Sequence, residues 1–135
     1  MTDRLSLSLS SRSIARGVAG GKSVGRFEGM VYVAQDAQRT DAEQQNRNLL
    51  LSEKARIETM PQLEIYADDV KCSHGATVGQ MDQEAIYYMR QRGIAEEQAR
   101  RLQILGFVDE LVMSCGEECL CGAVVELMEQ KLQTM

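Results

Sequence analysis

The periodicity of the apolar residues changes once along the chain, at Asp82. Before that residue, short runs alternate between apolar and polar side chains, which is typical of strands with one buried face. After it, apolar residues recur every three or four positions, which is typical of amphipathic helices. The sequence therefore predicts β structure in residues 1–80 and a helical domain in residues 81–135, an α+β arrangement.

The first region predicts many short strands joined by turns. They fall at Leu5–Leu9, Arg12–Val18, Val24–Val33, Ala55–Thr59, Leu63–Ala67 and Val70–His74. We expect residues 34–47 to be a polar connection whose side-chain amides satisfy backbone groups, and Pro61 to interrupt a strand. No helical pattern separates successive strands, which argues against a doubly wound fold. Stacked rungs of a solenoid or β-helix fit the pattern better than a sandwich, although the sequence repeat is weak.

The second region predicts about three helices. Asp82 is a good N-cap for the first helix, and Gly93 is a good C-terminal stop. The second helix begins near Glu96, and the third runs from about Glu117 to Leu132. We expect Ile86 and Met89 to face inward, and we expect apolar stripes at Leu102, Leu105, Val108 and Val112 and at Leu120, Val124, Leu127 and Met128.

Charge and hydropathy narrow the function classes. The net charge is -5 with a pI of about 4.9, and the whole negative excess lies in residues 81–135. A nucleic-acid binder would need a basic face to neutralise phosphates, so we expect no nucleic-acid partner. No apolar run is long enough to span a bilayer, and the N-terminus lacks the apolar core of a secretory signal. We therefore expect a cytoplasmic protein with no membrane association and with reduced cysteines.

Cys72 and His74 are the residues best placed to carry chemistry. On a strand, positions two apart point the same way, so both side chains could meet one ion or one reacting group. Thiolate and imidazole are good ligands for zinc, copper and iron–sulfur centres, but two ligands do not close a site. The spacing alone favours a small core cysteine beside a hydrogen-bonded histidine over a ligand pair.

Three further cysteines, Cys115, Cys119 and Cys121, form a weak metal motif. They straddle a predicted helix start and have no fourth ligand nearby, so packing as small apolar residues is the simpler interpretation. The chain also has a single histidine and no spacing of serine, histidine and aspartate that suggests a hydrolase, which leaves few candidates for a general base.

Three stretches carry a family resemblance: Thr59–Gly79, Thr40–Ser52 and Tyr87–Ile94. They closely resemble the SufD subunits of the SufB/SufD family, which serve the Suf iron–sulfur cluster assembly system. The resemblance extends from about Arg12 to Glu110. It implies the end of a right-handed parallel β-helix followed by a helical domain.

The same resemblance implies a non-catalytic scaffold subunit. Such a subunit pairs with a SufB-like protein and binds a SufC-like ATPase, which hydrolyses the ATP. The family's functional histidine, in its Cys-Ser-His-Gly motif, falls on His74, near the subunit interface where a cluster is thought to form, and Cys72 takes the motif's cysteine. Residues 82–132 correspond to the ATPase-docking element. The resemblance implies that the isolated chain holds no metal and no tightly bound cofactor. In the complex, an iron–sulfur cluster could form at His74 and Cys72.

The chain is much shorter than whole SufD subunits, so we expect a fragment that starts part-way along the solenoid. Its first rung would expose an open core edge, and we expect self-association through that edge. The Cys115–Cys121 cluster matches no motif of the family and inherits no role. Two alternatives stay open at this point: a stand-alone metal-binding or thiol protein that uses Cys72 and His74, and a purely structural solenoid piece.

Overall fold

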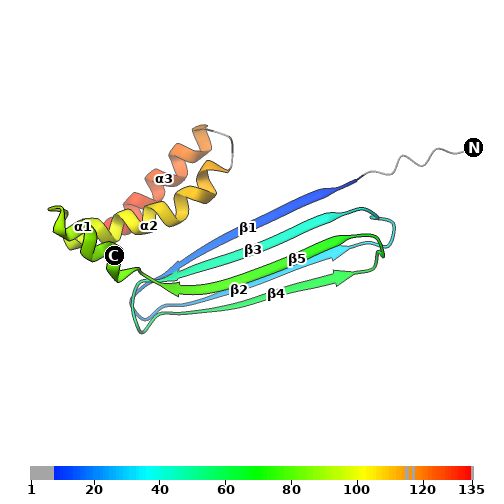
Figure 1. The fold of residues 1–135 in the computed structure, drawn as a ribbon, viewed down its shortest axis with the longest axis horizontal. Helices are drawn as coiled ribbons and strands as arrows, with labels where there is room; N and C mark the ends of the chain where they lie inside the picture. The colour runs from blue at the N-terminus through cyan, green and yellow to red at the C-terminus, as the bar shows by residue number, and fades with distance from the viewer. Residues whose placement is uncertain (1–7, 115, 117, 135) are drawn as a thin grey trace, which may run out of the picture.

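A computed structural model describes residues 8–114, 116 and 118–134. Five strands precede three helices, as Figure 1 shows. The strands are β1 (Ser10–Ala19), β2 (Val24–Val33), β3 (Asp41–Leu50), β4 (Arg56–Ile65) and β5 (Lys71–Gln80). The helices are α1 (Gln83–Gln91), α2 (Glu96–Met113) and α3 (Glu118–Gln133). The predicted α+β class, with strands first and three helices after, is confirmed.

The five strands form two parallel sheets, one in the order β1-β3-β5 (sheet A) and one in the order β2-β4 (sheet B). The chain alternates between the sheets, so that Ser10 pairs with Asp41, and Asp41 pairs with Lys71. Each circuit of the chain therefore takes about 30 residues, as stacked rungs require. The strands of the two sheets run in opposite directions, and the helices lie at the end where β1, β3 and β5 finish (Figure 1).

Residues 34–40 are the predicted polar connection, but strand β3 shows that the prediction is wrong for residues 41–47. Its side chains at Gln44, Asn46 and Asn48 point between the sheets and are buried. Asn48 Nδ2 donates hydrogen bonds to Asn46 Oδ1 at 2.6 Å and to the Thr77 carbonyl at 3.1 Å. Because the amides of Asn46 and Asn48 satisfy each other and the backbone, a strand this polar can occupy the centre of sheet A.

Pro61 also departs from its prediction, because β4 continues through it. The backbone N–H groups of Arg56 and of Tyr66, just after β4, donate to the carbonyls of Ser23, just before β2, and of Val33 at its end. Since N–H groups of a strand alternate in direction, even-numbered residues of β4 face β2 and Pro61 faces the other, free edge. The proline therefore removes no hydrogen bond of the ladder, as expected for an edge strand.

The remaining predicted strands agree only in part with the observed ones. The strand predicted at Arg12–Val18 is part of β1, and the one predicted at Val24–Val33 is β2 itself. The two short strands predicted on either side of Pro61 are one strand, and β5 continues well beyond His74 to Gln80. The strand predicted at Leu5–Leu9 lies mostly outside the described residues.

The helix boundaries follow the predicted local signals. Asp82 accepts hydrogen bonds from the N–H groups of Glu84 and Ala85 at 2.9 and 3.1 Å, so it is the N-cap of α1. Gly93 follows α1 with φ +87°, a conformation that glycine adopts without steric cost. The first helix is therefore bounded by the two residues that predicted it.

The helices pack onto the strand region through one apolar cluster. It joins the end of β3 to all three helices and consists of Leu49, Met81, Ile86, Ala99 and Ile104, with Met89, Phe107 and Leu132 packed against it. The predicted inward positions of α1 are confirmed. The predicted stripe of α2 is confirmed in part: Val112 is buried and Leu105 and Val108 are half-buried, whereas Leu102 is 45% exposed and Ala99 and Ile104 face the core instead. In α3, Val124 and Met128 are half-buried, whereas Leu120 and Leu127 are exposed.

Candidate functional site

Strand β5 brings Cys72 and His74 to the same face of sheet A. In the parallel register, Cys72 pairs with Ala42 and His74 pairs with Gln44. Paired residues of neighbouring parallel strands share a face, and both partners on β3 are buried between the sheets. Cys72 and His74 therefore lie on the face that turns toward sheet B, two residues apart.

Both side chains remain accessible because β5 is an edge strand. Within the described residues, no strand pairs with its free edge. Cys72 is half-buried with a free thiol, and His74 is exposed. A group docking along this edge would thus meet a sulfur and an imidazole nitrogen side by side.

The pair does not form a closed metal site by itself. Across the described part of the chain, no group of three or more histidine, cysteine, aspartate or glutamate side chains could hold a metal ion. Of the second cysteine cluster, Cys121 lies on α3 with its Sγ at 3.1 Å from the Val112 carbonyl. Cys115 and the side chain of Cys119 lie outside the described residues. Any ion held by Cys72 and His74 needs ligands from another molecule or from elsewhere in a longer chain.

Gln44 is a neighbour of this pair that the sequence analysis did not single out. It is 4% exposed, and its Oε1 has no hydrogen-bond partner. The signal was present in the sequence, because the amides at Gln44, Asn46 and Asn48 recur with the period of a strand. The run was interpreted as a polar loop instead.

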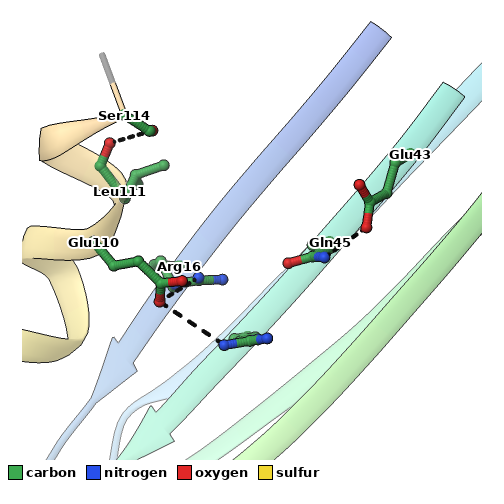
Figure 2. Close-up of polar contacts among 7 residues, drawn as sticks. Arg16, Glu43, Gln45, Glu110, Leu111 and Ser114 are labelled. Atoms are coloured by element: carbon green, nitrogen blue, oxygen red, sulfur yellow. Dashed lines mark hydrogen bonds and ion pairs between the residues drawn. The ribbon is translucent and has the colours of Figure 1, made fainter. Parts of the chain in front are cut away.

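A second missed feature lies on the outer face of sheet A. The Arg16 side chain is 2% exposed, and its Nη2 lies 3.0 Å from Glu110 Oε2 on α2. Figure 2 shows Glu110 reaching from the helix to Arg16 on β1. Arg47 approaches the same carboxylate oxygen at 3.8 Å, and the Arg16 guanidinium lies 5.7 Å from the centroid of the Phe107 ring. This contact holds α2 against the sheet.

The fold and the site together define the class: an α+β protein of stacked parallel strands with a cysteine–histidine pair on its open edge strand. Comparison with known proteins gives the family. The family description "SUF system FeS cluster assembly, SufBD core domain" matches residues 8–107. The chain therefore belongs to the SufBD family of iron–sulfur cluster assembly proteins.

Similar curated proteins agree with this assignment. The chain is 44% identical to the iron–sulfur cluster assembly protein SufD of Escherichia coli (strain K12) over 122 residues, which cover 90% of this chain and 29% of the relative. It is 39% identical to SufD of Bacillus subtilis (strain 168) over 107 residues, which cover 79% of this chain and 24% of the relative. The chain is 52% identical to a SufBD family protein of Synechocystis over 86 residues, which cover 64% of this chain and 19% of the relative.

The resemblance predicted from the sequence is confirmed, including its restriction to part of a SufD subunit. The chain spans less than a third of the length of these relatives. Among the described helices, none is long and apolar enough to cross a membrane.

Proposed function

We propose that this chain is part of a non-catalytic scaffold subunit of a cytoplasmic iron–sulfur cluster assembly complex. In this proposal it pairs with a SufB-like protein and docks a SufC-like ATPase, which supplies the ATP hydrolysis. Family membership supports a role in cluster assembly. The observation that carries the proposal further is the accessible Cys72–His74 pair on the edge strand β5, which offers two iron ligands and leaves the others to a partner.

The scaffold would be a right-handed parallel β-helix that continues before β1. Two parallel sheets with a circuit of about 30 residues support this architecture. At the β1–β2 edge the interior is open, with a hollow of about 220 Å³ lined by Gly17, Phe27 and Ile57 among others. A preceding rung would fill it. For the chain by itself, self-association through this edge stays our prediction.

At the subunit interface, Cys72 and His74 would hold a cluster or its iron only in the assembled complex. The chain would then carry no tightly bound cofactor when it is isolated. Thiolate sulfur and neutral imidazole nitrogen both coordinate iron in such clusters. Their shared face lets both reach one cluster, and the open edge leaves room for the ligands of the partner.

We expect His74→Ala and Cys72→Ala to reduce cluster assembly in the full complex by about tenfold or more, because each removes one ligand. Ser73→Ala is the matched control, because Ser73 lies between them on the opposite face of β5. The measurement is the visible absorbance of the cluster formed anaerobically by the complex with SufB-like and SufC-like partners. Assembly at the control level in both variants would reject the site.

The same samples separate the proposal from a stand-alone metal or thiol protein that uses Cys72 and His74. Metal analysis of the isolated chain, purified without oxygen, should find no stoichiometric metal. Tightly held metal at one equivalent, lost in His74→Ala, would favour the stand-alone protein instead.

Docking of the SufC-like ATPase is proposed for the acidic helices in residues 82–132. Between α2 and α3 lies an apolar groove of about 370 Å³, lined by Leu102, Leu105, Val125 and Met128 among others. An uncovered apolar groove on a negatively charged domain suits a partner helix or loop with basic flanks.

We expect Leu102→Arg to weaken binding of the ATPase at least tenfold, because it places a charge in this groove. Val24→Arg is the control, since Val24 is also an exposed apolar residue, at 67% against 45% for Leu102, but lies on β2, away from the helices. Binding is measured by pull-down and by titration calorimetry. Equal affinity of the two folded variants would remove the groove from the docking surface.

A further inference from the structure

Gln44 holds a buried acceptor that no described residue satisfies. The residue is 4% exposed, and its Oε1 is without a hydrogen-bond partner. Leaving such an atom unpaired costs about 1–3 kcal/mol. The other inward amides of β3 do not share this defect, because Asn46 and Asn48 bond to each other. The unpaired atom therefore marks a place where a donor is missing.

The position of the Gln44 amide is fixed from the side of sheet B. A Cβ added at Gly29 of β2 would overlap Nε2 of Gln44 and would crowd the ring of Phe27. The amide is thus packed against a glycine that leaves just enough space for it. The side chain has little freedom to turn its oxygen toward solvent.

Two register partners flank Gln44 on the same face of sheet A: Ser13 of β1 and His74 of β5. Neighbouring strands lie about 4.8 Å apart, so the side chains of Ser13 and His74 both start at a distance from which a contact with Gln44 is possible. A serine hydroxyl stays close to its own backbone, whereas an imidazole extends about as far above the sheet as a glutamine amide. His74 is therefore the partner whose polar hydrogen can meet the amide tip.

We propose that Gln44 is a positioning residue for His74: its Oε1 accepts a hydrogen bond from one imidazole N–H and leaves the other ring nitrogen free to bind a metal. The contact forms when the exposed ring turns about its Cβ–Cγ bond toward the amide. This inference rests on the proposed function for the role of His74, but the contact itself does not.

The chemistry of imidazole explains why such a partner matters. A neutral ring has one donor and one acceptor nitrogen, and a metal binds only the nitrogen that carries the lone pair. A hydrogen bond to the N–H selects the tautomer and the ring orientation, and loss of such a partner typically costs about 10–100-fold in metal affinity or activity. Gln44 is uncharged, so it can orient the ring without adding a negative charge to the site.

The test uses ¹⁵N NMR of the chain, in which His74 is the single histidine. In the unmodified chain, the two ring nitrogens should show one dominant tautomer. In Gln44→Met, which has a similar volume and no acceptor, they should move to the tautomer ratio of free histidine. Gln45→Met is the control, because Gln45 lies on the opposite face and bonds to Glu43. A ring with the free-histidine ratio in the unmodified chain would overturn the proposal, even if Gln44→Met does not fold.

A second readout concerns the complex. Gln44→Met should reduce cluster assembly about tenfold while its melting temperature stays unchanged or rises, because it removes an unpaired acceptor. Unchanged assembly in Gln44→Met, with assembly lost in His74→Ala, would reject the positioning role and keep the proposed function. Unchanged assembly in His74→Ala would reject the site, whereas the tautomer measurement would still decide the contact.

Discussion

Replacing Glu110 with alanine is expected to lower the free energy of unfolding by about 3 kcal/mol, because it leaves a buried guanidinium without a counter-charge. The Arg16 side chain is 2% exposed, and among the described residues Glu110 is its one partner in an ion pair. Nε and Nη1 of Arg16 are buried and make no hydrogen bond to a described residue, so besides the Phe107 ring the carboxylate is the main compensation for the charge. Urea unfolding of the chain followed by circular dichroism measures the change.

Two control variants test whether the loss of stability comes from the buried charge of Arg16. Arg47→Ala should cost about 0–1 kcal/mol, because Arg47 is half exposed and lies 3.8 Å from the same carboxylate. Arg16→Met should be neutral or stabilising, because it removes both the buried charge and the two unpaired nitrogens Nε and Nη1. A Glu110→Ala variant no less stable than Arg47→Ala would show that water compensates Arg16 instead.

The same contact connects stability to the proposed function. Glu110 lies on α2, and α2 forms one wall of the groove proposed for the ATPase. Arg16 lies on β1, in the sheet that carries Cys72 and His74. An ion pair that joins these two elements fixes the orientation of the docking groove relative to the candidate site.

The parts of the fold that the sequence predicted correctly depend on local interactions. The N-cap at Asp82 and the stop at Gly93 act within a few residues, and the change of period marks where the strands end and α1 begins. Val24–Val33 was predicted as a strand because its own side chains alternate. No knowledge of distant residues was needed for these elements.

The wrong predictions concern residues whose environment comes from distant parts of the chain. The amides of β3 are buried because they pair with one another and with Thr77 of β5. Pro61 continues a strand because its nitrogen faces a free edge. Arg16, for which the sequence analysis made no prediction, lies on the outer face of β1, and the packing of α2 buries it through Glu110, 94 residues further along.

The candidate site was predicted in part. The strand period placed Cys72 and His74 on one face, and the structure confirms this placement, whereas their interpretation as ligands rests on the family resemblance. Neither argument pointed to Gln44, because its position beside His74 depends on the register between β3 and β5. Pairing between parallel strands about 30 residues apart leaves no local trace in a single sequence.

The buried asparagines of β3 give the second large expected effect. Asn48→Ala should lower the free energy of unfolding by about 2–3 kcal/mol, because it removes the donor to Asn46 Oδ1 and to the Thr77 carbonyl. Gly17→Ala should cost about 1–3 kcal/mol for a different reason. A Cβ at Gly17 of β1 would overlap Oδ1 of Asn48, and the amide cannot swing away without breaking its own hydrogen bonds.

The two substitutions should therefore not add. In Gly17→Ala combined with Asn48→Ala, the new methyl group enters the space that the amide has left, so the double variant should be more stable than the sum of the single effects by at least about 1 kcal/mol. Gly79→Ala is the control, because nothing lies near a Cβ at that position of β5, and it should change stability by less than about 0.5 kcal/mol. Urea unfolding of the unmodified chain, the two single variants and the double variant gives the free energies that this comparison needs, and Gly79→Ala is measured beside them. Additive losses would mean that Asn48 adjusts freely, and that the inward amides fill the space between the sheets without fixing how the strands pack.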